Sequence, residues 1–348
     1  MRHATKRIVL CGLSTVGKAF AELIEQRREQ ITRKYGLNLQ IAAAVDIGGA
    51  AVADQGDLPL DELLRHLDAG GLVETFSPYG RPGLSGTEAL ASIPAQILVE
   101  TTPTNLVDGE PARGHILAAL NNGLDVVSAN KGPLVLYYRE IRNLADDKGC
   151  RILMSAATAA ALPTLDVGLI CLAGADVLAI EGVLNGTTNY ILTRMHVEKC
   201  SYQTALQAAQ EMGIAETDPT LDVEGFDTRN KMIVIANRIF DQNFGPDDVP
   251  LEGITGVTPA DIDNAIAAGN VIKLVGTAAR DINGLTISVA PKVLEADHPL
   301  AAVNFAEKGI SYLTDTMGRV TVTGGKSSPT GAAAALLKDL IHTVILSD

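Results

Sequence analysis

The sequence has little of what several protein classes require. Its 348 residues include no tryptophan, only six histidines and only four cysteines, which are Cys11, Cys150, Cys171 and Cys200. The cysteines form no CxxC pair, so a recognisable zinc motif is excluded and no metal centre is expected. Four thiols without a secretory signal fit a reduced, cytosolic chain.

Basic residues and long apolar runs are also scarce. The chain has 28 Lys+Arg against 41 Asp+Glu and a net charge of -13, which argues against nucleic-acid and anionic-membrane partners. The most apolar long window, residues 152–175, contains Pro163 and Asp166, so no membrane helix is expected. Hydrophobic residues still make up 47%, enough for a sizeable core, and the length suggests two domains or one large one.

The first half alternates short apolar runs with helical patterns. Strands are predicted at residues 8–11, 41–45, 97–99, 126–128 and 152–154, and helices at 20–31 and 115–122. Repeated strand–helix–strand units predict an α/β fold with a doubly wound, Rossmann-type parallel sheet. The Gly- and Pro-rich stretch 48–86 is predicted to form one short helix, at 60–67, between loops.

The second half shows a different pattern. Strands are predicted at 179–184, 271–277, 285–290, 310–314 and 320–323, and helices at 201–212, 228–240 and 332–345. The later strands follow one another without intervening helices, which indicates a mostly antiparallel sheet. A second, α+β domain is therefore expected.

A glycine loop follows the first predicted strand. Gly12 and Gly17 stand at the first and last positions of the GxGxxG dinucleotide fingerprint, and Ser14 replaces the middle glycine. The first glycine permits the tight turn, the last permits close helix–strand packing, and the N–H groups of the following helix can bind phosphate. Two alternatives stay open: purely structural glycines, or a P-loop in which Ala19 stands where Ser or Thr holds Mg²⁺.

Asp46 ends the second predicted strand and bears on the choice of cofactor. A carboxylate there can accept hydrogen bonds from the ribose hydroxyls of an adenosine. Residues 47–50 contain no Arg or Lys to bind a 2′-phosphate, which favours NAD over NADP. A solvated aspartate at a strand end is the plainer alternative.

Several later segments closely resemble homoserine dehydrogenases. They are residues 100–106 (ETTPTNL), 109–112 (GEPA), 126–134 (VVSANKGPL) and 182–191 (GVLNGTTNYI). The run from residue 209 to 231 is similar to the family's signature at every fixed position, which include Gly213, Asp218, Pro219, Asp222, Asp227 and Lys231. So many fixed positions in so short a run are specific, and the resemblance extends over essentially the whole chain.

The resemblance implies NAD(P)-dependent interconversion of L-homoserine and L-aspartate 4-semialdehyde, in threonine and methionine biosynthesis. It implies a dinucleotide-binding domain at residues 1–155, completed by 324–348, and a substrate and dimerisation domain at 156–323. A cytoplasmic homodimer is expected. The chain ends at Asp348, which leaves no room for the regulatory or kinase domain of some members, so a short form is expected.

The resemblance also implies residue roles. Lys131, Lys231 and Asp222 would be catalytic. The two lysine ammonium groups, held close together, would lower each other's pKa and could then exchange a proton with the substrate hydroxyl. Asp227 and Lys231 are four residues apart, so on a helix they can pair. The implied substrate-binding set is Gly186, Thr187, Glu216, Asp222 and Asp227. The implied cofactor-binding set is Gly12, Ser14, Thr15, Val16, Gly17, Asp46, Thr101, Thr102, Asn105, Lys131, Gly324 and Thr330.

Plainer interpretations and departures accompany these roles. Asp227 could cap a helix, and Lys231 could be a solvated helix residue. Many members use a glutamate to hold a monovalent cation where this chain has Ser155, so no bound metal is expected. The alternatives to a homoserine dehydrogenase are a non-catalytic nicotinamide-dinucleotide-binding regulator and a dehydrogenase of a related amino alcohol.

Overall fold

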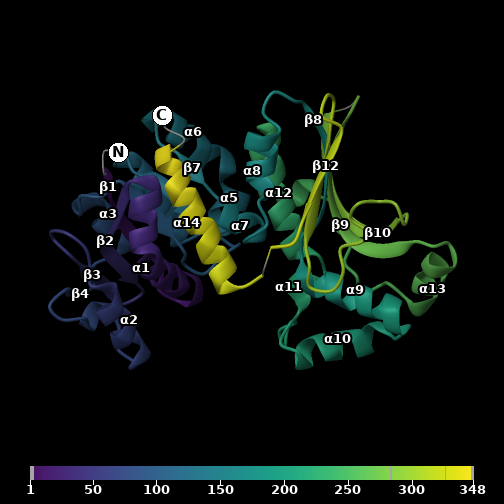
Figure 1. The fold of residues 1–348 in the computed structure, drawn as a ribbon, viewed down its shortest axis with the longest axis horizontal. Coiled ribbons are helices and arrows are strands. Elements are labelled where there is room, and N and C mark those ends of the chain that lie inside the picture. Colours follow the sequence, from purple (N-terminus) through teal and green to yellow (C-terminus); the bar gives the residue numbers. More distant parts are fainter. Residues whose placement is uncertain (1–3, 283, 326, 346–348) are drawn as a thin grey trace. The chain divides into compact units, whose positions relative to one another are not determined.

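The computed structural model describes residues 4–282, 284–325 and 327–345. The chain divides into two compact units: unit 1 comprises residues 1–160 and 328–348, and unit 2 comprises residues 161–327 (Figure 1). Among the described helices, none combines the length and the hydropathy that a membrane crossing requires.

Unit 1 is built on a sheet that, in the described part of the chain, has seven strands in the order β4-β3-β2-β1-β5-β6-β7. The strands are β1 (Ala4–Cys11), β2 (Leu37–Asp46), β3 (Gly49–Val52), β4 (Gly80–Pro82), β5 (Ile97–Glu100), β6 (Asp125–Ser128) and β7 (Ile152–Leu153). β1 pairs in parallel with both β2 and β5, and the parallel pairing continues through β6 to β7. The chain thus winds outward in both directions from β1, which confirms the predicted doubly wound sheet.

The edge of this sheet beyond β2 differs from the prediction. β3 and β4 lie within the stretch 48–86, where only the helix α2 (Leu60–Asp68) and loops were expected, and both strands pair antiparallel. β3 reads Gly-Ala-Ala-Val and is fully buried, while β4 has three residues ending in Pro82. Such short strands carry little local β-propensity, and pairing with β2 determines their conformation.

The helices of unit 1 flank the sheet. They are α1 (Thr15–Tyr35), α2, α3 (Gly86–Ser92), α4 (Ala112–Asn121), α5 (Gly132–Leu136), α6 (Tyr138–Lys148), α7 (Ser155–Ala159) and α14 (Pro329–Ile345). α1 ends at Gly36, which takes the left-handed conformation (φ 66°) that closes a helix C-terminus.

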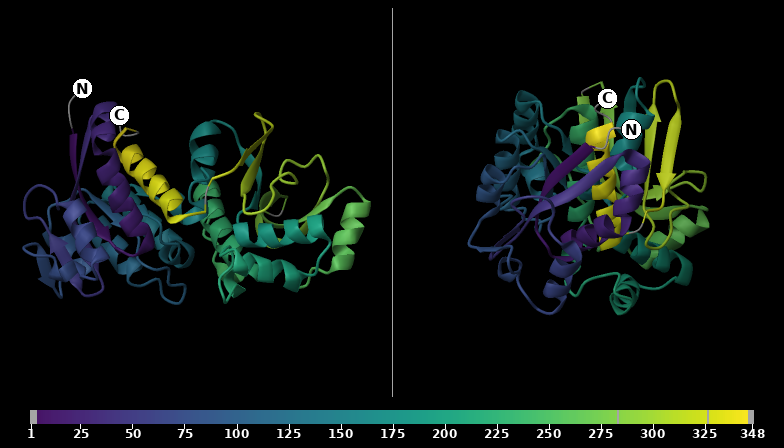
Figure 2. Two further views of the ribbon diagram at one scale, coloured as in Figure 1. Left: turned by 60° about the horizontal axis from the view of Figure 1, so that its bottom comes forward. Right: turned by 60° about the vertical axis from the view of Figure 1, so that its left-hand side comes forward.

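The last helix, α14, belongs to unit 1 although unit 2 separates it in sequence from the rest. Figures 1 and 2 show it beside α1. Leu336 and Leu340 of α14 share a buried apolar cluster with Phe20 and Ile24 of α1. The predicted amphipathic C-terminal helix is therefore part of the unit 1 core.

Unit 2 contains a five-stranded sheet, among the described residues, in the order β10-β9-β8-β11-β12. Its strands are β8 (Val177–Val183), β9 (Val271–Asp281), β10 (Gly284–Leu294), β11 (Gly309–Thr314) and β12 (Arg319–Thr323). All four neighbouring pairs are antiparallel. Its helices are α8 (Thr164–Asp166), α9 (Gly186–Glu198), α10 (Tyr202–Glu211), α11 (Thr220–Val223), α12 (Phe226–Phe240) and α13 (Pro259–Ala267). The predicted α+β domain is confirmed.

The segment 182–191 comprises the end of β8, within the predicted strand 179–184, and the first turns of α9. Asn185 begins this helix, because its side-chain oxygen accepts a hydrogen bond from the Thr188 N–H at 2.9 Å. Such an N-cap satisfies a helix donor that would otherwise have no partner. The apolar run of β8 therefore passes directly into a capped helix.

Candidate active site

The glycine loop lies at the carboxyl end of β1, where close packing leaves no room for side chains. Gly12 has a φ of +90°, and a Cβ there would lie 2.7 Å from the Thr102 backbone nitrogen. A Cβ on Gly17 would run into the Gly12 carbonyl. Ser14 is the N-cap residue of α1 and, like Thr15, is exposed. The first N–H groups of this 21-residue helix can therefore bind a phosphate, so the loop fits a dinucleotide.

A buried polar cluster holds this loop in place. The Thr101 hydroxyl donates to the carbonyl oxygens of Cys11 at 2.9 Å and Gly12 at 2.7 Å. The neighbouring Glu100 carboxylate accepts from the Thr102 N–H at 2.7 Å and from its hydroxyl, and it is hydrogen-bonded to His115 Nδ1 at 2.8 Å. Of the predicted cofactor residues, Thr101 therefore holds the glycine loop directly, and Thr102 is fixed by Glu100.

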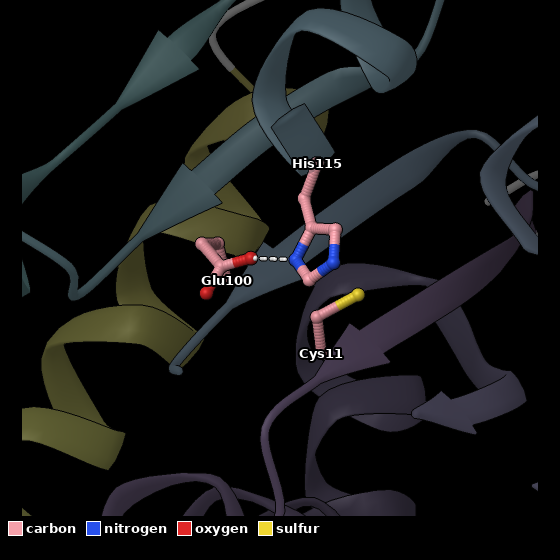
Figure 3. Close-up of side chains that lie close together, drawn as sticks. All are labelled: Cys11, Glu100 and His115. Atoms are coloured by element: carbon pink, nitrogen blue, oxygen red, sulfur yellow. Dashed lines mark hydrogen bonds and ion pairs between the residues drawn. The ribbon is translucent and has the colours of Figure 1, made fainter. Parts of the chain in front are cut away.

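Cys11, Glu100 and His115 lie close enough together to suggest metal ligands (Figure 3), a grouping that their sequence spacing did not reveal. The register of β1 and β5 places Cys11 beside Glu100, and α4 contributes His115. However, both Glu100 oxygens already accept hydrogen bonds. Burial and the nearby carboxylates of Glu100 and Asp46 raise the pKa of the Cys11 thiol well above its usual range, so a thiolate is disfavoured. The cluster fits a hydrogen-bonded support better than a metal site.

The remaining predicted cofactor residues of unit 1 follow its strands and helices. Asp46 ends β2, Val16 lies in the first turn of α1, and the exposed Thr330 lies in the first turn of α14. The Asn105 side chain donates to Asp108 at 2.7 Å, which fixes the loop after β5. Lys131 immediately precedes α5 and is half-buried.

Unit 2 contains a compact network of charged and amide side chains. Lys231 Nζ lies 2.5 Å from an Asp227 oxygen and donates to the Leu184 carbonyl at 2.9 Å. The Asn185 amide donates to Asp227 at 2.9 Å and to Asp222 at 2.6 Å. The structure therefore brings together three predicted residues, Lys231, Asp227 and Asp222, with Asn185 as the link between the two carboxylates.

This network gives the Lys231 ammonium a fixed position. Its side chain and that of Asp227 are only 14% and 15% exposed, so their pairing is stronger than that of a surface ion pair. Asp227 is in the first turn of α12, whose N-cap is Gly225, so Asp227 pairs with the lysine and is not the cap residue. A positioned, partly desolvated lysine can exchange a proton with a bound hydroxyl.

The other predicted substrate residues are placed less closely. Gly186 is the first residue of α9, and the buried Thr187 donates its hydroxyl to the Ile214 carbonyl at 3.1 Å. Glu216 is exposed and, within the described residues, lies outside the network that joins Asn185 to Lys231. Gly324 belongs to unit 2, where its N–H donates to the Lys308 carbonyl at 2.9 Å.

Asn185 is the site residue that the sequence interpretation missed. In the sequence it stands within the segment 182–191 that resembles the family, where only Gly186 and Thr187 were predicted to bind substrate. A helix-cap residue directly after a strand was the available signal.

A doubly wound sheet with this glycine loop, joined to a unit that presents a buried lysine–carboxylate network, defines the class of NAD(P)-dependent oxidoreductases. Family models agree: that of the homoserine dehydrogenase NAD binding domain matches residues 12–155, and that of homoserine dehydrogenase matches residues 163–341. The chain belongs to the homoserine dehydrogenase family.

Individual relatives match over nearly their full lengths. The homoserine dehydrogenase of Methanocaldococcus jannaschii is 36% identical over 96% of this chain and 97% of its own length. The NAD(+)-dependent homoserine dehydrogenase of Pseudomonas canavaninivorans is 34% identical over 97% and 95%. The structure of a hyperthermophilic archaeal homoserine dehydrogenase in complex with NADPH matches with a TM-score of 0.83, at 26% identity, over 99% of this chain and 98% of that chain.

The contacts of Ser155 show whether a monovalent cation fits at this position. Its N–H and hydroxyl both donate to Asp339 at 2.8 Å, and Lys338 Nζ donates to the Ser155 oxygen at 2.8 Å. An ammonium group therefore already contacts this serine, so the residues present do not fit a cation held there. Because this ammonium group repels a second cation, we expect turnover to change by less than about twofold with added Na⁺ or K⁺ at constant ionic strength. Strong activation by either ion, compared with tetramethylammonium, would contradict the prediction.

Proposed function

We propose that this chain catalyses the NAD(P)-dependent interconversion of L-homoserine and L-aspartate 4-semialdehyde. The observation that carries the proposal is the Lys231–Asp227–Asn185–Asp222 network, which fixes a partly buried ammonium group beside Asp227 and links that carboxylate to Asp222 through Asn185. Membership of the homoserine dehydrogenase family supports the choice of substrate.

The cofactor-binding residues are proposed on the geometry of unit 1. Gly12 permits the tight turn after β1, and Gly17 permits close packing of α1 against that turn. The N–H groups near Ser14, Thr15 and Val16 would bind the pyrophosphate. We assign Asp46 to the adenosine ribose, and Thr101, Thr102, Asn105, Lys131, Gly324 and Thr330 to the rest of the cofactor. The nicotinamide, when bound, supplies the hydride acceptor or donor.

The protein's own contribution is binding and proton transfer. Oxidation of an alcohol requires a group that accepts its proton, and Lys231 is proposed for that role with Lys131 as the second lysine. Asp222 would position Lys231 through Asn185 and Asp227, and Asp222 with Glu216 would bind the substrate's amino group. Gly186 and Thr187 would contact the polar end of the substrate.

The test is an absorbance assay at 340 nm with L-homoserine and either NAD or NADP, with purified Lys231→Ala as control. Reduction of the nucleotide by the parent and its loss in the variant would support the proposal. Dinucleotide binding without turnover would favour the non-catalytic regulator instead. A larger kcat/KM with a different amino alcohol would favour a related dehydrogenase.

We further propose that the enzyme is a cytoplasmic homodimer. Each of its cysteines is a free thiol, as expected in a reducing compartment. Dimerisation through unit 2 is suggested by the family resemblance. Light scattering during size-exclusion chromatography should give twice the chain mass of 36.5 kDa.

The surroundings of Asp46 lead to a prediction of cofactor preference. Its side chain accepts a hydrogen bond from the Ile47 N–H at 2.9 Å. A second carboxylate, that of Glu74, lies against Gly48, two residues after Asp46. Arg81, the nearby cation that could bind a 2′-phosphate, contacts Asp54 at 3.6 Å and donates to the Gly80 carbonyl at 3.1 Å. Because like charges in a partly desolvated site repel, we expect kcat/KM to favour NAD by about tenfold.

Asp46→Ala should reduce this preference, because it removes the carboxylate that repels the phosphate. Kinetics with both nucleotides test the prediction, and Asp61→Ala, which removes an exposed carboxylate from α2, is the matched control. A parent that prefers NADP, or no relative gain for NADP in Asp46→Ala, would show that Asp46 does not determine the choice.

A further inference from the structure

A buried amide side chain, that of Asn130, stands directly before Lys131 in unit 1. Asn130 is 1% exposed and lies in the short connection between the end of β6 and the start of α5. Burying an amide is costly unless its N–H groups and its oxygen are hydrogen-bonded. The partners of the Asn130 side chain therefore show what holds the backbone at Lys131.

The amide nitrogen of Asn130 reaches the loop that follows the neighbouring strand, β5. It donates to the Thr102 carbonyl at 2.9 Å and to the Pro103 carbonyl at 3.1 Å, and it also lies 3.2 Å from the Thr102 hydroxyl. β5 and β6 are parallel neighbours, so their carboxyl ends meet at the same edge of the sheet. The amide nitrogen therefore joins the loops at the ends of two adjacent strands.

The amide oxygen of Asn130 fixes the turn into α5. It accepts from the Gly132 N–H at 3.0 Å, so a hydrogen-bonded turn two residues long encloses Lys131. A Cβ on Gly132 would run into the Asn105 carbonyl oxygen, which shows that this turn packs directly against the loop after β5. The Lys131 N–H adds a longer contact, at 3.4 Å, to the Thr104 hydroxyl in the same loop.

These contacts continue from the loop after β5 to the glycine loop after β1. Asn130 holds the backbone at Thr102, and the preceding residue, Thr101, donates its hydroxyl to the Gly12 carbonyl at 2.7 Å. The loops after β6, β5 and β1 are thus joined in series along one edge of the sheet. In a doubly wound sheet this is the edge at which ligands bind.

A lysine that takes part in proton transfer or cofactor binding needs a fixed starting point. Its side chain has four rotatable carbons, and a misplacement of about 1 Å can lower a catalytic rate by about 10²-fold. We propose that Asn130 is a positioning residue for Lys131. Its amide bridges the loop after β5 and the start of α5, and so places the lysine beside the proposed cofactor residues Thr102 and Asn105. This inference rests on the proposed function, through the role of Lys131.

The test measures how strongly a bound nucleotide protects Lys131 from chemical labelling. Trace acetic anhydride, read by peptide mass spectrometry, is applied with and without NAD or NADP at concentrations that saturate each variant. The parent should show protection of Lys131, and Asn130→Ala should lose it. Asn130→Asp should lose it too, because a carboxylate keeps the oxygen for the Gly132 N–H but cannot donate to the two carbonyls.

Asn237→Ala is the matched control, since it removes an equally buried amide from unit 2. The Asn237 side chain donates to the Phe244 carbonyl at 2.9 Å and accepts from the Phe244 N–H at 2.8 Å, so a similar loss of stability is expected without a change at Lys131. No protection in the parent, parent-like protection in Asn130→Ala or Asn130→Asp, or an equal loss in Asn237→Ala overturns the proposal.

If Asn130→Ala does not fold by circular dichroism, Asn130→Ser decides. A serine hydroxyl can still accept from the Gly132 N–H, but it is too short to reach the Thr102 carbonyl, so parent-like protection there overturns the proposal.

Turnover separates this proposal from the proposed function. Where turnover is found, kcat should fall about tenfold or more in Asn130→Asp and stay at the parent value, per folded molecule, in Asn237→Ala. Protection that depends on Asn130 without any turnover would contradict the proposed function and support the positioning of Lys131. Turnover in the parent with unaltered protection in the Asn130 variants would do the reverse.

Discussion

Replacing Lys231 with alanine is expected to lower kcat by about 10²-fold or more, the usual contribution of a positioned acid or base. The ammonium group is held by Asp227 at 2.5 Å and by the Leu184 carbonyl at 2.9 Å, and alanine leaves no group there to exchange a proton. Lys131→Ala should show a loss of similar size. Steady-state kinetics with saturating cofactor measure both effects.

The matched control is Arg238→Ala, which removes a cation from α12 seven residues, or about two turns, beyond Lys231. It should keep near-parent turnover, and circular dichroism should show that all three variants fold. Near-parent turnover in both lysine variants would remove both side chains from the mechanism.

Asp339→Ala is expected to lower the free energy of unfolding by about 3 kcal/mol, the cost of leaving buried donors without partners. Asp339 is fully buried and accepts from the N–H and the hydroxyl of Ser155, both at 2.8 Å. Burial raises the pKa of its carboxyl above the ordinary value, while Lys338 and Ser155 oppose that shift. Since these bonds join α14 to α7, their loss weakens the attachment of the last helix.

Urea denaturation monitored by circular dichroism measures this effect, with Lys338→Ala as control. Lys338 is partly exposed, so its ion pair with Asp339 should contribute no more than about 1 kcal/mol. Equal losses in the two variants would mean that the Asp339–Ser155 bonds do not hold α14.

The sequence was most informative where local pattern and tertiary environment agree. β1, β2 and β5 lie in the middle of the sheet, where both faces of a strand are covered. Such strands have continuous apolar runs, and these runs predicted them. β3 and β4 escaped prediction because glycine, alanine and proline form strands only when a neighbouring strand supplies the pairing.

The candidate site was predictable through spacing but not through topology. Asp227 and Lys231 are one helical turn apart, so their pairing could be expected from the sequence alone. Asn185 joins them only because the end of β8 and α12 come together, and more than forty residues separate Asn185 from Lys231. No periodicity reports such contacts. The exposure of Glu216 likewise depends on the path of a loop that composition does not determine.

The placement of α14 has a consequence during synthesis on the ribosome. Unit 1 needs residues 328–345 to complete its core, and all of unit 2 is translated before them. At about 5–20 residues per second, the apolar face of α1 that includes Phe20 and Ile24 waits roughly 10–40 s after residue 160 for Leu336 and Leu340 to emerge. Unit 2 can therefore fold first, and the nascent N-terminal half is a candidate client for chaperones that bind exposed apolar segments.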